Sequence, residues 1–302
     1  MGAGKRSQPP LRKGRHLALP CPGVDLNAAW LRRVETLALR LSALDERREG
    51  LGRRAALGTG QEFVGFRPYR EGEDLRQLDW GLMARLGKPF IRATRRETAE
   101  RWQVRLDASR SMGCGPPGKL QAAAELCGGL VGAALHQGAE VEVFASGPSG
   151  PRRFFVRRRA DLMGLVAFLN ALRAEDEGGM HQLLSMEGGR RGAGRVFLLG
   201  DLFDVTPDAV LSLLARGREI RLLQILTPDE LSPELASVDW RDPEGDGRRR
   251  VDLDPVIRSH YEKALEEHLR AWHALARHST VTHHLHLSNH DFADRLAEVL
   301  VR

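Results

Sequence analysis

The chain has 302 residues, of which 42% are hydrophobic and 28% charged, and its formal net charge is +6. These values are typical of a globular protein with one large domain or two modest ones, and no apolar run reaches the roughly 18 residues of a transmembrane helix. The three cysteines form no C-x-x-C pair and the basic N-terminus lacks the apolar core of a signal peptide, so we expect a cytoplasmic protein without a disulfide framework.

The N-terminal part of the chain is predicted to contain three segments. Residues 1–23 combine glycine, proline and basic side chains without periodicity, and we expect a disordered tail. A helix is predicted over residues 25–50, because apolar side chains recur there at helical spacing: Leu26, Trp30, Val34, Leu37, Leu41 and Leu44. Residues 51–101 alternate short apolar pieces with glycine and proline, which indicates short strands, one of them near Phe90–Arg95. We therefore group residues 24–101 as an N-terminal helix with a small strand-rich extension.

From residue 102 to residue 302 strands and helices alternate. This rhythm predicts an α/β domain of the Rossmann type, with a mostly parallel sheet covered by helices on both faces. Strands are expected at 103–107, 140–145, 195–200, 219–226 and 280–287, and an edge strand at 152–157. Helices are expected at 119–136, 161–173, 181–186, 207–216, 255–277 and 291–301. The polar excursion at 227–250 is long enough to cover the ligand edge of the sheet.

The candidate site begins where an apolar strand ends at Asp107, because Ser109 and Ser111 follow in the spacing D-x-S-x-S. A second apolar strand ends at Asp201. Ligands of an open α/β sheet bind outside the carboxyl ends of its strands, at the point where strand order reverses, so we expect both carboxylates at one place. Hard oxygen ligands of this kind suit Mg²⁺, and a metal held by Asp107, Ser109, Ser111 and Asp201 would accept a partner's carboxylate. The simpler interpretation of the D-x-S-x-S string is a turn in which Asp and Ser bond to the backbone.

Two other functions compete with a metal site. Residues Gly113–Lys119 fit the phosphate-loop pattern G-x-x-x-x-G-K and would make this a nucleotide-binding protein. Against this, Leu120 stands where Ser or Thr should hold Mg²⁺, and the loop begins several residues after its strand. Nucleic-acid binding is the other alternative, since arginines cluster at Arg152-Arg153, Arg157–Arg159, Arg190-Arg191 and Arg248–Arg250, besides the basic tail. These clusters are scattered along the chain, and solvated loops are the simpler interpretation.

Three segments together resemble a known family. They are Gly65–Trp80, then Ala84-Arg85, then Leu106–Met112, and they are similar to the domain of unknown function 58. The family pattern is R-x-Y-x-x-G-D-x-x-R-x-I-D-W, then A-R, then a strand that ends in D-x-S-x-S-M. Here Glu73 replaces the aspartate and Leu78 the isoleucine. The resemblance extends over roughly residues 50–302.

The resemblance implies a von Willebrand factor A-like fold and partnership with MoxR-type AAA+ ATPases in assembling or maturing client proteins. It also implies a metal-ion-dependent adhesion site, which Asp201 completes together with a threonine in a Gly-Gly-Thr context. Here the comparable residues are Gly178-Gly179-Met180, and a thioether is a poor Mg²⁺ ligand. We therefore expect a non-enzymatic adaptor or co-chaperone whose Mg²⁺ site is incomplete.

Overall fold

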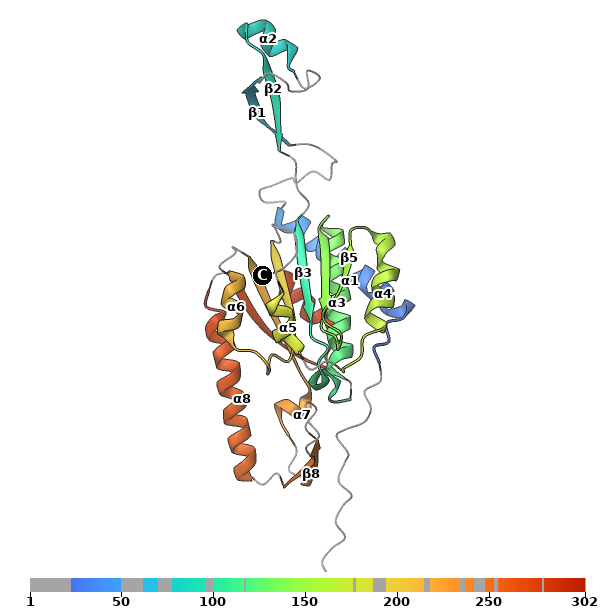
Figure 1. Ribbon diagram of the computed structural model, residues 1–302. Helices are drawn as coiled ribbons and strands as arrows, with labels where there is room; N and C mark the ends of the chain where they lie inside the picture. The colour runs from blue at the N-terminus through green and yellow to red at the C-terminus, as the bar shows by residue number, and fades with distance from the viewer. Residues whose placement is uncertain are drawn as a thin grey trace, which may run out of the picture. The chain divides into compact units, whose positions relative to one another are not determined.

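A computed structural model of the protein describes most of the chain (Figure 1). The described residues are 23–49, 62–69, 78–95, 100–116, 118–175, 178–186, 194–214, 218–233, 237–241, 248–252, 255–278 and 280–301. The tail expected at residues 1–23 thus lies outside them, except for Gly23. The chain divides into two compact units, Glu46–Ala99 and the remainder on either side of it.

The smaller unit contains a two-stranded antiparallel sheet. Strands β1 (Glu62–Pro68) and β2 (Phe90–Arg95) pair in it, and helix α2 (Trp80–Leu86) lies between them in sequence. Asp79 caps α2, because its Oδ1 accepts a hydrogen bond of 2.9 Å from the backbone N–H of Leu82. The strand-rich extension predicted for this segment is therefore present.

The larger unit is built on a six-stranded sheet in the order β10-β7-β6-β3-β4-β5. The strands are β3 (Arg101–Leu106), β4 (Glu140–Ala145), β5 (Arg152–Val156), β6 (Arg195–Gly200), β7 (Glu219–Leu226) and β10 (Val281–Leu287). Only β5 among them runs antiparallel to its neighbour, so the predicted mostly parallel α/β sheet is confirmed. After β3 the chain adds β4 and β5 on one side and then continues with β6 on the other. Strand order therefore reverses between β3 and β6, where α/β sheets bind ligands.

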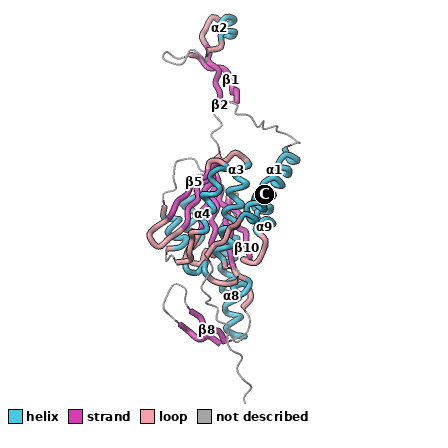
Figure 2. The backbone as a smooth tube through the Cα atoms, turned by 90° about the vertical axis from the view of Figure 1, so that its right-hand side faces the viewer, coloured by secondary structure: helices cyan, strands magenta, loops and turns pink. Residues whose placement is uncertain are grey.

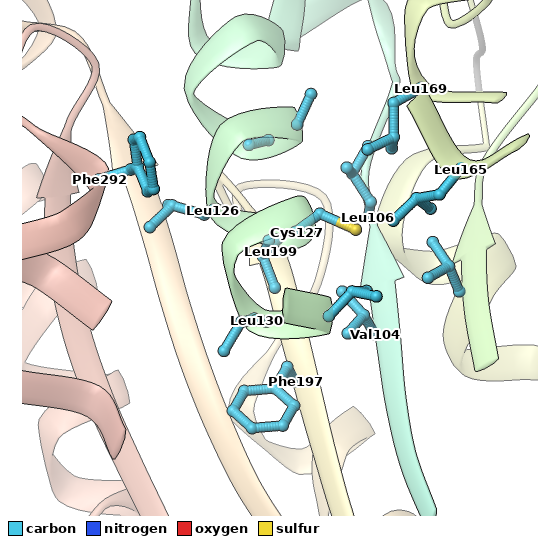
Figure 3. Packing of buried hydrophobic residues seen from close by; sticks show 14 of the residues in the cluster. Val104, Leu106, Leu126, Cys127, Leu130, Leu165, Leu169, Phe197, Leu199 and Phe292 are labelled. Carbon is cyan, nitrogen blue, oxygen red and sulfur yellow. The ribbon is translucent and has the colours of Figure 1, made fainter. Parts of the chain in front are cut away.

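Helices cover both faces of this sheet (Figures 1 and 2). One face carries α1 (Ala28–Glu49), α3 (Lys119–His136), α4 (Leu162–Asn170) and α9 (Phe292–Val301), and the other carries α5 (Gly179–Ser185), α6 (Pro207–Leu214) and α8 (Pro255–Leu275). Side chains of a strand alternate between the faces. Phe197 and Leu199 of β6 accordingly pack with the first group (Figure 3), and Val196 and Leu198 with the second.

Helix α1 packs in the core of the larger unit. A Cβ atom added at Gly128 of α3 would lie 2.2 Å from the Trp30 ring, and one at Gly132 would lie 2.3 Å from Val34. Because these two glycines have no side chains, they form a groove on α3 in which the apolar stripe of α1 packs. The Trp30 ring is also 6.3 Å from that of Phe292. The segment grouped as residues 24–101 therefore divides, with α1 in the larger unit and the strands in the smaller one.

Some element boundaries differ from those expected. The helix predicted over 161–173 is a 3-10 turn, η3 (Arg159–Asp161), followed by α4, which ends at Asn170. It ends early because Arg173 donates to the carbonyl oxygens of Asn170 and Leu172, at 2.8 and 2.7 Å. The short helix α5 begins at Gly179, two residues before the expected start.

The polar excursion at 227–250 has structure of its own. It begins with the short helix α7 (Pro228–Leu231), and an antiparallel pair, β8 (Ser237–Arg241) and β9 (Arg248–Asp252), follows. Across the described part of the chain, every helix is too short or too polar to cross a lipid bilayer.

Candidate functional site

The site lies at the carboxyl ends of β3 and β6. Asp107 follows β3, and its backbone N–H donates to the Leu199 oxygen of β6 at 2.8 Å. Asp201 follows β6. Both aspartates are almost completely buried, at 0% and 1% exposed. The structure thus brings together the two carboxylates that the sequence placed at the reversal of strand order.

The D-x-S-x-S loop turns back on itself directly after β3. Oδ1 of Asp107 accepts a hydrogen bond of 2.8 Å from the N–H of Ser109, and the hydroxyl oxygens of Ser109 and Ser111 are 3.0 Å apart. Ser146 fixes the loop from the neighbouring strand end, because its Oγ accepts the N–H of Ala108 at 2.8 Å. Oδ2 of Asp107 is buried and accepts no hydrogen bond within the described part of the protein. One carboxylate oxygen therefore remains available beside two hydroxyl groups.

A third carboxylate, which the sequence analysis missed, belongs to the same cluster. Ligand oxygens of Asp107, Asp201 and Asp204 lie within 4.8 Å of one another. Oδ2 of Asp204 accepts the N–H of His181 at 2.9 Å, and a Cβ at Gly179 would come within 2.6 Å of that oxygen. Gly179 also has a φ of +45°, so only glycine allows this approach without strain. The Gly178-Gly179 pair was the one sequence feature that could have indicated a close contact of this kind, although it does not name Asp204 as the partner.

Burial and repulsion within the cluster favour protonation. Burial, followed by the charge of Asp201, raises the pKa of Asp107 to about 8. Burial and the charge of Asp201 also raise the pKa of Asp204. Without a cation the cluster therefore keeps a proton near neutral pH. A cation at the same place would remove the repulsion and release that proton.

Lys119 introduces a positive charge that the sequence analysis assigned elsewhere. It is the first residue of α3, and its side chain is 1% exposed. Its Nζ lies 2.9 Å from Oδ2 of Asp201 and 2.6 Å from Oε1 of Glu230. Burial alone would lower the pKa of Lys119, but the two carboxylates outweigh that effect and raise it. Lys119 is therefore a charged ammonium held between two acids.

Glu230 reaches the site from the polar excursion. It belongs to α7, and Thr227 and Glu230 form a capping box in which each side chain accepts the other's backbone N–H, at 3.1 and 2.8 Å. The Tyr261 hydroxyl of α8 donates to the Glu230 carbonyl at 2.6 Å. The first part of the excursion thus contributes directly to the ligand edge of the sheet.

The arrangement around Gly113–Lys119 differs from that of a phosphate loop. Strand β3 ends at Leu106, and a 3-10 turn, η2 (Arg110–Gly113), separates it from the rest of the glycine-rich segment. The Lys119 ammonium, which should contact phosphate in such a loop, is instead bound by two carboxylates. These features disfavour the nucleotide-binding alternative.

The arginine clusters lie on separate elements. Residues 152–159 belong to the edge strand β5 and the turn after it, and residues 248–250 belong to β9. Residues 190–191 and the basic tail lie outside the described residues.

The residues present fit a small divalent cation in part. Asp107, Ser109, Ser111 and Asp204 offer hard oxygens, and the unpartnered Oδ2 of Asp107 is the atom that a cation would satisfy. Asp201 differs, because Lys119 already occupies its Oδ2. Met180, the residue that takes the position of the threonine in the sequence resemblance, is completely buried.

Comparison with known proteins identifies one family. The sequence profile of the family described as protein of unknown function DUF58 matches residues 65–271, which is more than half of the chain. No curated protein matches the chain.

Proposed function

Because the chain belongs to the family of proteins of unknown function DUF58, we propose that it is a protein-binding adaptor or co-chaperone, and not an enzyme. In this proposal it works in the cytoplasm with a MoxR-type AAA+ ATPase and a client protein. The contact is made through a von Willebrand factor A-like domain. The smaller unit carries the first part of the family pattern, and the D-x-S-x-S loop carries the last.

The observation that supports this proposal most is the buried Asp107 carboxylate with one oxygen unpartnered. It lies beside the hydroxyl groups of Ser109 and Ser111, at the edge of the sheet where α/β proteins bind ligands. Mg²⁺ would be held there by these three residues, and the bound ion would attract an acidic side chain of the partner. Hydroxyl ligands leave much of the ion's charge uncompensated, which favours a further carboxylate.

A binding experiment with a MoxR-type AAA+ ATPase from the same organism tests the proposal. The double variant Asp107→Ala/Ser109→Ala should lose most of the ATPase retained by the wild type in a pull-down with Mg²⁺, and EDTA should have the same effect on the wild type. Thr36→Ala is the control, because Thr36 is exposed on α1 and its hydroxyl donates to the Arg32 carbonyl of the same helix. Equal retention by the wild type and the double variant would contradict a site-centred contact.

A further inference from the structure

Asp201 and Asp107 differ in what their oxygens contact. Oδ2 of Asp201 accepts from the Lys119 ammonium at 2.9 Å, and its Oδ1 accepts the N–H of Phe203 at 3.3 Å. Both oxygens of Asp201 are therefore engaged. Asp107 has only Oδ1 engaged, and its Oδ2 is buried without a partner in the described structure. The two aspartates end neighbouring strands, but only Asp107 has an oxygen left for a ligand.

Asp204 lies close to both other aspartates, because ligand oxygens of Asp107, Asp201 and Asp204 are within 4.8 Å of one another. A Cβ added at Gly179 would be 2.6 Å from Oδ2 of Asp204 and 3.4 Å from Cβ of Ser109. Only the backbone of Gly179 therefore lies between Asp204 and Ser109 at this point. Asp204 also lies within reach of Asp107. Its Oδ2 accepts the backbone N–H of His181 at 2.9 Å, and the backbone N–H groups of Met180 and Asp204 also stabilise the carboxylate.

Charge balance separates the cluster into two halves. Lys119 compensates Asp201 and is shared with Glu230, whose side chain is 24% exposed and partly compensated by water. Asp107 and Asp204 remain, two carboxyl groups to which no basic side chain is bonded in the described residues. Asp204 is exposed, but Asp107 is completely buried, and a charge on a buried carboxylate is costly without compensation. One divalent cation supplies the missing charge.

We propose that the site holds two cations of different kinds. Lys119 is a permanent, tethered cation for Asp201. A divalent cation binds on the other side, to Asp107, Ser109, Ser111 and Asp204. Asp204 thus serves as the metal ligand in place of Asp201 and the missing threonine, the two ligands that the resemblance implies. This assignment rests on metal binding as in the proposed function, but it does not depend on the adaptor role.

Titration of the metal-free protein with Mn²⁺, followed by the electron paramagnetic resonance of free Mn²⁺, tests the assignment. Asp204→Asn should weaken Mn²⁺ binding at least tenfold, whereas Asp201→Asn should change the Kd less than threefold. Lys119→Met should strengthen Mn²⁺ binding at least tenfold, because it gives Asp201 to the metal, and the double variant Lys119→Met/Asp201→Asn should lose that gain. Asp208→Asn, an exposed acid on α6, is the control.

Two results would overturn the assignment: a wild type that binds no Mn²⁺, and an Asp201→Asn variant that loses as much affinity as Asp204→Asn. Circular dichroism of each variant establishes that it is folded. Should Asp204→Asn unfold, Asp204→Ser is the second variant at this position, since its hydroxyl retains an acceptor for the His181 N–H. The adaptor role is judged separately. A variant that loses Mn²⁺ but retains the ATPase would contradict metal-dependent partner binding and leave this assignment intact.

Discussion

Replacing Asp107 by Asn should change how the stability of the protein depends on pH. The pKa of Asp107 rises from an ordinary value of 3.8 to about 8 in the fold. Between these values the folded protein keeps a proton that the unfolded chain has released, so the free energy of unfolding falls as pH rises. The free energy of unfolding falls by about 1.4 kcal/mol for each unit by which the pH rises in this range. From pH 5 to pH 7 this one group therefore removes about 3 kcal/mol.

Asp107→Asn keeps an acceptor for the Ser109 N–H and has no charge to titrate. Urea unfolding in EDTA at pH 5, 6 and 7 should show that the variant gains about 3 kcal/mol on the wild type across this interval. Contributions from groups outside the aspartate cluster cancel in the difference between the two proteins. Asp25→Asn, at an exposed position before α1, should follow the wild type. Parallel pH dependence of Asp107→Asn and the wild type would refute the raised pKa of Asp107.

Three further results are expected. Gly128→Ala should destabilise the fold by about 1–3 kcal/mol in urea unfolding, because its Cβ would meet the Trp30 ring. The same change should cost little in a Trp30→Ala background. Additive losses in the double variant would argue against this contact. Lys119→Ala should lower the free energy of unfolding by about 3–5 kcal/mol, since it leaves two carboxylates without their cation. Adding Glu230→Gln should recover part of the loss. An unchanged midpoint of urea unfolding in Lys119→Ala would show that the ion pairs contribute nothing to stability. Calorimetric titration with ATP–Mg²⁺ into protein already saturated with Mg²⁺ should give no heat, and heat that depends on Lys119 under these conditions would revive the phosphate loop.

The sheet and half of the candidate site follow from local sequence patterns. Apolar runs that end in Asp107 and Asp201 are enough to predict their meeting, because parallel strands bring their carboxyl ends to one edge. Ser109 and Ser111 follow from their spacing to Asp107. The two serines are close because they belong to one short loop, and their Oγ atoms are 3.0 Å apart.

The other half depends on contacts between distant segments. Lys119 fits a local phosphate-loop pattern, but its partner Glu230 lies 111 residues away, and no spacing rule links them. Asp204 follows Leu202, a buried residue with a φ of 61°. That left-handed turn, together with the close approach of Gly179, decides where the Asp204 carboxylate lies. Neither can be obtained from the periodicity of strands and helices.

The packing of α1 sets an order for folding during synthesis. The helix leaves the ribosome before any strand of the large sheet, yet Trp30 is covered by Gly128 of α3 and by Phe292 of α9, far downstream. The whole smaller unit is translated in the interval. Translation proceeds at about 5–20 residues per second, so the apolar stripe of α1 stays uncovered for many seconds, which is long compared with helix formation. The apolar stripe of this amphipathic helix thus gains its last contact, with Phe292, only after α9 has been made.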